Sequence, residues 1–98
     1  MICDFCHGPD PAWRFHAQPF VVDYGIGVQS ASDADWAACD ACREFILAGD
    51  RAGLVERAMR VAPRIPGANE SEVRQLRSWA HSLFFHHRLP DGPLRIDP

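Results

Sequence analysis

The sequence predicts a small α+β protein with a β-hairpin near its start and three helices after it. Three observations favour this fold class: a strand-like alternation in the first third, helical periodicity from Asp40 onward, and two cysteine pairs that bracket the hairpin. The chain has 98 residues, of which 47% are hydrophobic. This length and composition fit one globular domain, with room for an appended element.

The first half of the hairpin is expected in residues 12–24. Trp13, Phe15 and Ala17 alternate with polar residues, and a period of two is typical of a half-buried strand. Pro19 has no amide donor, so we expect it at a bend or at a sheet edge. Extended chain is therefore predicted on both sides of this proline.

The hairpin tip and the C-terminal tail are expected to be irregular. Gly25, Gly27 and the polar run of residues 29–35 are typical of a long loop, after which residues 35–37 can return as the partner strand. The tail from Leu89 contains three prolines and is expected to lack regular structure.

The first helix is predicted to start at Asp40, within the second cysteine pair. Ala41, Phe45 and Ala48 share one helical face, and Gly49 is placed to end the helix in the left-handed conformation.

A second helix is predicted directly after the first. Asp50 can cap it, although Gly53 costs about 1 kcal/mol relative to Ala inside a helix. Pro63 and Pro66 end it. Its apolar stripe contains Leu54, Val55, Ala58, Met59 and Ala62.

A third helix is expected after a stiff linker at residues 63–68. Asn69, with Glu72 three residues on, resembles a capping box, and the helix should run to about Arg88. Its apolar face is expected to contain Val73, Leu76, Ala80 and Leu83. Its polar face is expected to contain Glu70, Arg74, Arg77, His81 and Arg88. Further aromatic residues widen the apolar surface, which indicates deep packing or a binding partner: Trp79, Phe84 and Phe85.

Two Cys-x-x-Cys pairs supply the strongest chemical signal in the chain. Cys3 and Cys6 form one pair, and Cys39 and Cys42 form the other. A two-residue gap lets both sulfurs of a turn point at one ion, and two such pairs complete the tetrahedral site of structural zinc. We therefore predict one structural zinc ion held by these four cysteines. Iron can occupy the same thiolate cage, so the identity of the metal stays open.

The order of knuckle, hairpin and cysteine pair at a helix start resembles the treble-clef zinc finger over about residues 2–48. The resemblance implies that the last two ligands come from the first turn of the helix, where free N–H groups and the positive dipole end stabilise thiolates. The chain is also similar to small uncharacterised actinobacterial or phage proteins with paired cysteine motifs. The residues that carry this similarity are Trp13, residues 35–42, residues 48–50 and residues 53–54. That similarity implies no activity.

The chain is predicted to divide near residue 63. Residues 1–62 would form the treble-clef module with its following helix, and residues 63–98 a linker, an amphipathic helix and a tail packed on that module. Residues 1–50 carry two Arg and eight carboxylates, a net charge of −6, whereas the remainder carries +3. A zinc ion with four thiolates would add about −2 to the acidic half.

We expect a non-enzymatic adaptor or regulator that binds another protein, or a second copy, through Trp79, Phe84 and Phe85. The alternative is a nucleic-acid-binding regulator, because arginines of the last two helices and of the linker between them could contact phosphates. These are Arg57, Arg60, Arg64, Arg74, Arg77 and Arg88. A net charge of −3 argues against tight non-specific binding of DNA.

An HNH-type nuclease, which also uses a treble clef, is a minor alternative. His16 is the hairpin histidine that could activate water, but no Asn or His partner follows the cysteine helix at a useful spacing. The start shows no secretion leader, no run approaches the roughly 18 apolar residues of a membrane span, and four cysteines fit a reducing compartment. We therefore expect a cytoplasmic protein.

Overall fold

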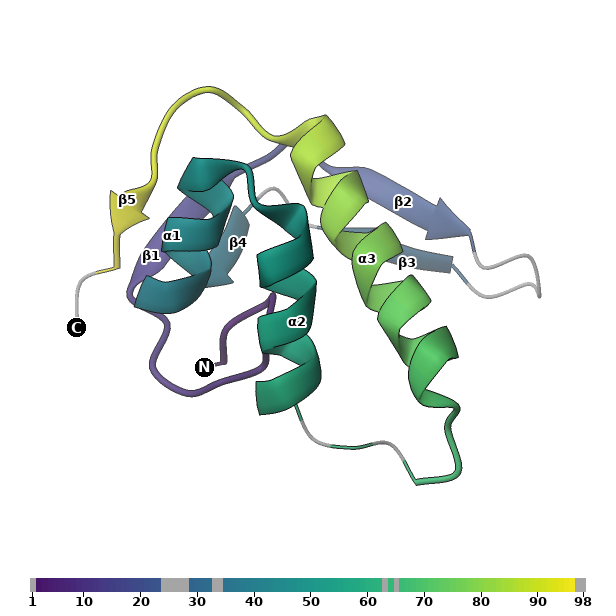
Figure 1. Cartoon of the computed structure of the whole chain (residues 1–98). Helices are drawn as coiled ribbons and strands as arrows, with labels where there is room; N and C mark the ends of the chain where they lie inside the picture. Colours follow the sequence, from purple (N-terminus) through teal and green to yellow (C-terminus); the bar gives the residue numbers. More distant parts are fainter. Residues whose placement is uncertain (1, 24–28, 33–34, 63, 65, 97–98) are drawn as a thin grey trace.

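The computed structural model describes residues 2–23, 29–32, 35–62, 64 and 66–96 (Figure 1). The predicted tip glycines, Gly25 and Gly27, lie outside this part of the chain. Within it the protein is α+β, with a three-stranded antiparallel sheet, a two-stranded ribbon and three helices. The strands are β1 (Trp13–His16), β2 (Phe20–Asp23), β3 (Gln29–Ser32), β4 (Asp35–Ala38) and β5 (Leu94–Arg95), and the helices are α1 (Asp40–Ala48), α2 (Arg51–Val61) and α3 (Glu70–His87).

The predicted pairing of the two hairpin arms is confirmed at β1 and β4. Phe15 lies opposite Trp36, and Trp13 lies opposite Ala38. Phe15 is buried, as the alternating pattern requires for the inward face of a strand. Between these arms, β1 ends at His16 and β2 begins at Phe20, so Pro19 lies between two strands and not inside one.

Two segments expected to be irregular form strands instead. Gln29–Ser32 was predicted as loop, yet it pairs with Phe20–Asp23 as β3 of the ribbon. Leu94–Arg95 was predicted as irregular tail, yet it adds to the free edge of β1 as β5 (Figure 1). Ladder pairing requires extended backbone rather than apolar side chains, so neither strand carries an alternating pattern that would mark it. β5 also satisfies backbone groups of β1 that would otherwise remain open at a sheet edge.

The helix ends follow the local chemistry of the sequence. Gly49 ends α1 with a φ of 68°, and its N–H bonds to carbonyls of the last turn. Asp50 caps α2 by accepting a hydrogen bond from the N–H of Gly53 over 2.9 Å. Asn69 caps α3 by accepting from the N–H groups of residues 71 and 72. These three predictions are confirmed.

The buried face of α3 differs from the predicted one. His81, expected on the polar face, is only 3% exposed, whereas Leu76, expected on the apolar face, is 57% exposed. Phe84 is fully buried and sets the orientation of the helix toward the core. The helix is therefore rotated about its axis relative to the prediction. Burial of the large Phe84 ring stabilises this orientation more than burial of the smaller Leu76 side chain would stabilise the predicted one.

An aromatic cluster joins α3 to the start of the chain. The Phe84 ring lies 4.9 Å from that of Phe5, 5.8 Å from that of Phe15 and 5.2 Å from that of Trp36, measured between centroids. The core thus contains residues from both sides of the predicted boundary at residue 63. In Figure 1, α2 packs between α1 and α3, and α2 and α3 diverge toward the segment that connects them.

Candidate metal centre

The first cysteine pair lies in a tight turn at the start of the chain. The His7 N–H donates to the Cys3 carbonyl over 2.9 Å, and the Cys3 N–H donates to the Gly8 carbonyl over 2.8 Å. The Gly8 N–H also donates to Cys6 Sγ over 3.4 Å. His7 has a positive φ of 62°, which turns the chain sharply after Cys6. A Cβ on Gly8 would come within 3.2 Å of Cys6 Sγ, so glycine permits this close approach.

The second cysteine pair lies where β4 runs into α1. Cys39 is the N-cap residue of α1 and Cys42 lies in its first turn, as predicted. The Cys39 N–H donates to Cys3 Sγ over 3.4 Å, so the backbone of one pair contacts a sulfur of the other. The Asp4 N–H donates to the Ala37 carbonyl over 2.8 Å, and the Ala37 N–H donates to Asp4 Oδ2 over 2.7 Å. These contacts hold the N-terminal turn against β4.

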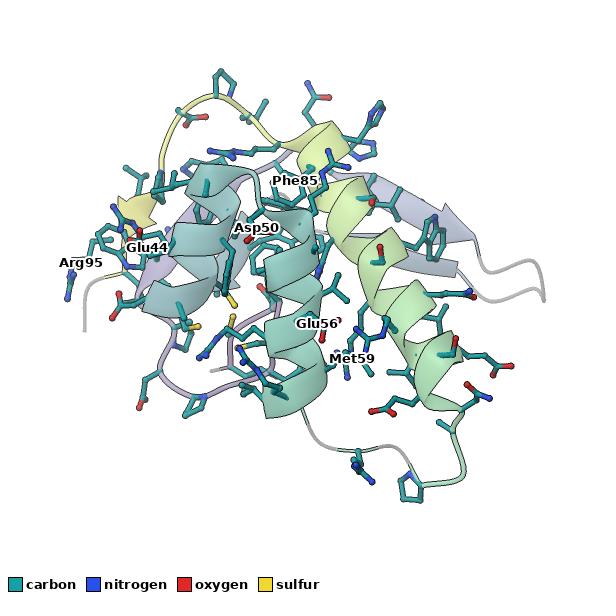
Figure 2. All side chains as sticks on the ribbon, in the orientation of Figure 1. Glu44, Asp50, Glu56, Met59, Phe85 and Arg95 are labelled. Carbon is teal, nitrogen blue, oxygen red and sulfur yellow. The ribbon has the colours of Figure 1, made fainter. Side chains whose placement is uncertain are left out.

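The four sulfurs converge on one point. All four Sγ atoms lie within 4.8 Å of one another, and Cys6 Sγ lies 3.8 Å from Cys39 Sγ. A tetrahedron with zinc–sulfur bonds of about 2.3 Å has edges of about 3.8 Å, so the spacing is compatible with zinc. Three of the cysteines are fully buried and Cys39 is 8% exposed. In Figure 2, sulfur atoms gather between α1, α2 and the N-terminal segment.

The cysteines share negative charge unevenly. The pKa of Cys3 falls to about 4, chiefly because the Cys42 thiol donates to its sulfur and also because backbone N–H groups do so. The pKa of Cys42 is raised, chiefly because its thiol donates a hydrogen bond to the Cys3 sulfur and also because it is buried. Burial also raises the pKa of Cys6. A divalent cation among the sulfurs is what would let all four ionise together, so the donor set fits a metal of this charge.

Arg57 contacts this cluster, although the sequence suggested that it binds phosphate. Its Nη2 donates to Cys39 Sγ over 3.7 Å. Burial opposes the charge of Arg57, but the contact with Cys39 and the charges of the neighbouring cysteines raise its pKa. Spacing along the chain gives no signal for this contact, because residues 39 and 57 meet only through the packing of α1 against α2.

Two more of the six predicted phosphate-binding arginines contact other groups of the chain. Arg74 forms an ion pair with Glu56, and the guanidinium of Arg88 lies 5.3 Å from the ring centre of Phe15. The other three are spread over α2, the linker and α3: Arg60, Arg64 and Arg77. Of these three, Arg60 and Arg64 are exposed and Arg77 is half-buried.

The three predicted partner-binding residues have different environments. Phe84 is fully buried, so it belongs to the core and cannot contribute to a docking surface. Phe85 is half-buried, and the guanidinium of Arg51 lies 4.7 Å from its ring centre. Trp79 is 41% exposed. Of these three, Trp79 and Phe85 thus have surface that another molecule could reach.

His81 is a residue next to the site that sequence reasoning missed. Its Nε2 lies 3.3 Å from the carbonyl oxygen of Phe5, between the two ligands of the first pair. Its ring also lies 5.6 Å from the Phe5 ring. On a helical projection, His81 shares a face with Arg74, Arg77 and Arg88, which favours a surface position. No pattern in the sequence therefore indicates that it is buried.

A cleft of about 340 Å³ lies between α2 and α3, near the segment that connects them. Its apolar lining includes Ala58, Met59 and Val73, and its charged lining includes Arg64, Glu70 and Arg77. Figure 2 shows Met59 on the side of α2 that faces α3.

His16, the residue that the nuclease hypothesis would use to activate water, lies on β1 and contacts a carboxylate of β4. Its Nδ1 lies 2.6 Å from Asp35 Oδ1, which is a contact across the paired strands β1 and β4. Among the described residues, one group of three or more metal-binding side chains lies close enough together to hold an ion. This group consists of the four cysteines. His7 and His16 are not part of that group.

Comparison with protein-family models, with curated proteins and with solved structures found no match to this chain. Within the described part of the chain, no helix has the length and apolar character needed to cross a membrane.

Proposed function

We propose that the chain is a structural-zinc protein of the treble-clef type. The converging cysteine cluster carries this proposal. Further support comes from the order of elements: a tight turn with the first pair, the β1–β4 hairpin, and a helix that begins at the second pair. Zinc held by Cys3, Cys6, Cys39 and Cys42 would cross-link the start of the chain to α1. Four protein ligands leave no coordination position for a substrate, as in structural zinc sites.

Metal analysis of the purified, reduced protein tests the metal centre. We expect about one zinc per chain, and a marked loss of bound zinc in Cys42→Ser. His7→Ala serves as the control, because His7 is exposed and is not part of the cluster. Folded protein without metal would refute the proposal, and iron in place of zinc would colour the protein and correct the identity of the ion.

We propose that the protein acts as a non-enzymatic adaptor in the cytoplasm, where reducing conditions keep the four thiols available. The cleft between α2 and α3 is the proposed docking site. Its apolar lining suits an apolar segment of a partner, and Arg64 and Arg77 suit an acidic residue beside that segment. Leu76 and Trp79 are also exposed on α3, but they are not part of the lining of this cleft.

Affinity capture from cells of the source organism tests the adaptor role. We expect a protein that the wild type and Gln75→Asp retain but Val73→Asp loses. Val73 lines the cleft, whereas Gln75 is exposed on the same helix and gives a control of equal charge. Equal capture by both variants would exclude the cleft as the docking site. A complex with RNA or DNA that weakens steeply with salt would favour the nucleic-acid alternative instead.

A further inference from the structure

The cysteine cluster concentrates negative charge in the interior. Four thiolates around a divalent cation carry about −2 in total, and a buried charge is costly unless other groups compensate it. Asp4 and Asp40 adjoin ligands in the sequence and add further negative charge, whereas Arg43, which adjoins Cys42, forms an ion pair with Glu44. The surrounding residues of the acidic half therefore do not neutralise the centre by themselves.

Backbone groups supply part of the compensation. The N–H groups of Gly8 and Cys39 each donate to a cysteine sulfur over 3.4 Å. The start of α1 directs its positive dipole end toward Cys39 and Cys42. These partial charges are spread over several atoms, and none of them is a full positive charge.

Arg57 supplies the full positive charge. Among the described residues, it is the basic side chain that donates a hydrogen bond to a cysteine sulfur, that of Cys39. Its Nε is buried and has no hydrogen-bond partner in the described part of the chain. One end of the guanidinium thus contacts the cluster, and the residue as a whole is half-buried. It comes from α2, in the basic half, and contacts the acidic half at the most exposed of the four ligands.

We infer that Arg57 is a positioning residue that determines how tightly the four cysteines retain their metal. The inference rests on the proposed zinc centre and adds the group that compensates its charge. A hydrogen bond to Cys39 Sγ lowers the electron density on that sulfur, and the nearby guanidinium offsets the charge left on the cluster. Loss of a partner that supports a ligand in this way typically weakens metal binding by about 10- to 100-fold.

Competition with a chromogenic chelator measures this effect on the zinc-loaded full chain. Arg57→Gln should bind zinc about 10- to 100-fold more weakly than the wild type. Arg57→Lys, which keeps the charge, should recover a large part of the loss. Arg60→Gln is the matched control, since Arg60 is exposed on the same helix and its loss changes the net charge equally. In the cobalt-substituted protein, Arg57→Gln should shift the sulfur-to-cobalt charge-transfer band to longer wavelength, because a sulfur lone pair without its hydrogen bond lies higher in energy.

The outcomes separate this inference from the zinc proposal. A wild type that binds no zinc would refute the zinc centre itself. A wild type that binds zinc, with Arg57→Gln equal to Arg60→Gln in affinity and in cobalt spectrum, would overturn only the role of Arg57. If Arg57→Gln does not fold, Arg57→Met, which keeps the length of the aliphatic stem, gives the same comparison.

Discussion

Among the described residues, His81 is the one polar residue that is buried, and it faces the turn that carries Cys3 and Cys6. Its Nε2 lies 3.3 Å from the Phe5 carbonyl, a distance at which an Nε2–H can donate, and its Nδ1 is buried without a partner within the described part of the chain. Burial lowers the pKa of His81 below its usual value of 6.5. The folded protein therefore favours the neutral imidazole.

The pH dependence of stability should reveal this buried histidine. Below pH 6.5 the unfolded chain takes up a proton that the folded chain resists, so the stabilising contribution of His81 is present above pH 6.5 and is lost as the pH falls. His81→Gln can keep a donor to Phe5 but does not titrate. Between about pH 7 and 5.5, urea unfolding of the zinc-loaded proteins should shift in favour of the variant.

Comparison of these two proteins cancels the acid sensitivity of the metal centre, because both keep the same four cysteines. If the free energies of unfolding of the two proteins changed in parallel over this pH range, the pKa of His81 would be the same in the folded and unfolded chains, which would contradict the prediction.

At the scale of elements, the junction of α1 and α2 depends on the absence of a side chain at Gly53. A Cβ built there would lie 2.5 Å from Asp50 Oδ2 and 2.6 Å from Phe45 Cε1. Asp50 caps α2, and Phe45 packs against the core from α1. The glycine thus lets the two helices approach closely while the cap stays in place.

Gly53→Ala distinguishes this packing role from helix propensity. Propensity alone predicts a gain of about 1 kcal/mol in the free energy of unfolding. We expect instead a loss of about 1 to 3 kcal/mol, as for other overpacked sites, because Phe45 and the cap must move. Ala52→Gly, at an exposed site of the same helix, should cost about 1 kcal/mol through propensity alone. Denaturant unfolding measures both, and a more stable Gly53→Ala protein would contradict the packing argument.

The elements differ in how far the sequence predicts them. The caps at Gly49, Asp50 and Asn69 follow from interactions within a few residues, and so does the spacing of each cysteine pair. β3 and β5 depend on pairing with distant strands, which their own residues do not indicate. The buried face of α3 and the contact between Arg57 and Cys39 likewise depend on how helices pack.

At the scale of the whole molecule, the metal centre and the aromatic core are joined through Phe5. This residue lies between the ligands Cys3 and Cys6, and its ring contacts Phe84 of α3 with a centroid distance of 4.9 Å. Cys3 and Cys42 lie at opposite ends of the hairpin, so a metal ion would close a long loop of the chain. Zinc binding by small fingers contributes about 10 to 16 kcal/mol, comparable with the total stability of a typical domain.

Metal removal should therefore loosen the third helix together with the cysteine module. After chelation under reducing conditions, we expect amide hydrogens of α3 to lose protection along with those of α1, and the near-ultraviolet circular dichroism to collapse in the same step. Hydrogen exchange followed by mass spectrometry measures this. Protection that persists in α3 while α1 exchanges freely would instead indicate two units that fold separately.

The hydrogen-bond geometry of His81 also bears on the axial register of α3. A slide of the helix by one turn, about 5.4 Å, would replace His81 opposite the Phe5 carbonyl with the residue four positions away. In one direction that residue is Phe85, which has no donor, and in the other it is Arg77, whose charge would enter the core. Either slip leaves a buried polar or charged group without proper compensation, which is costly. One imidazole can thus select a single alignment of an amphipathic helix whose apolar surface alone would tolerate several.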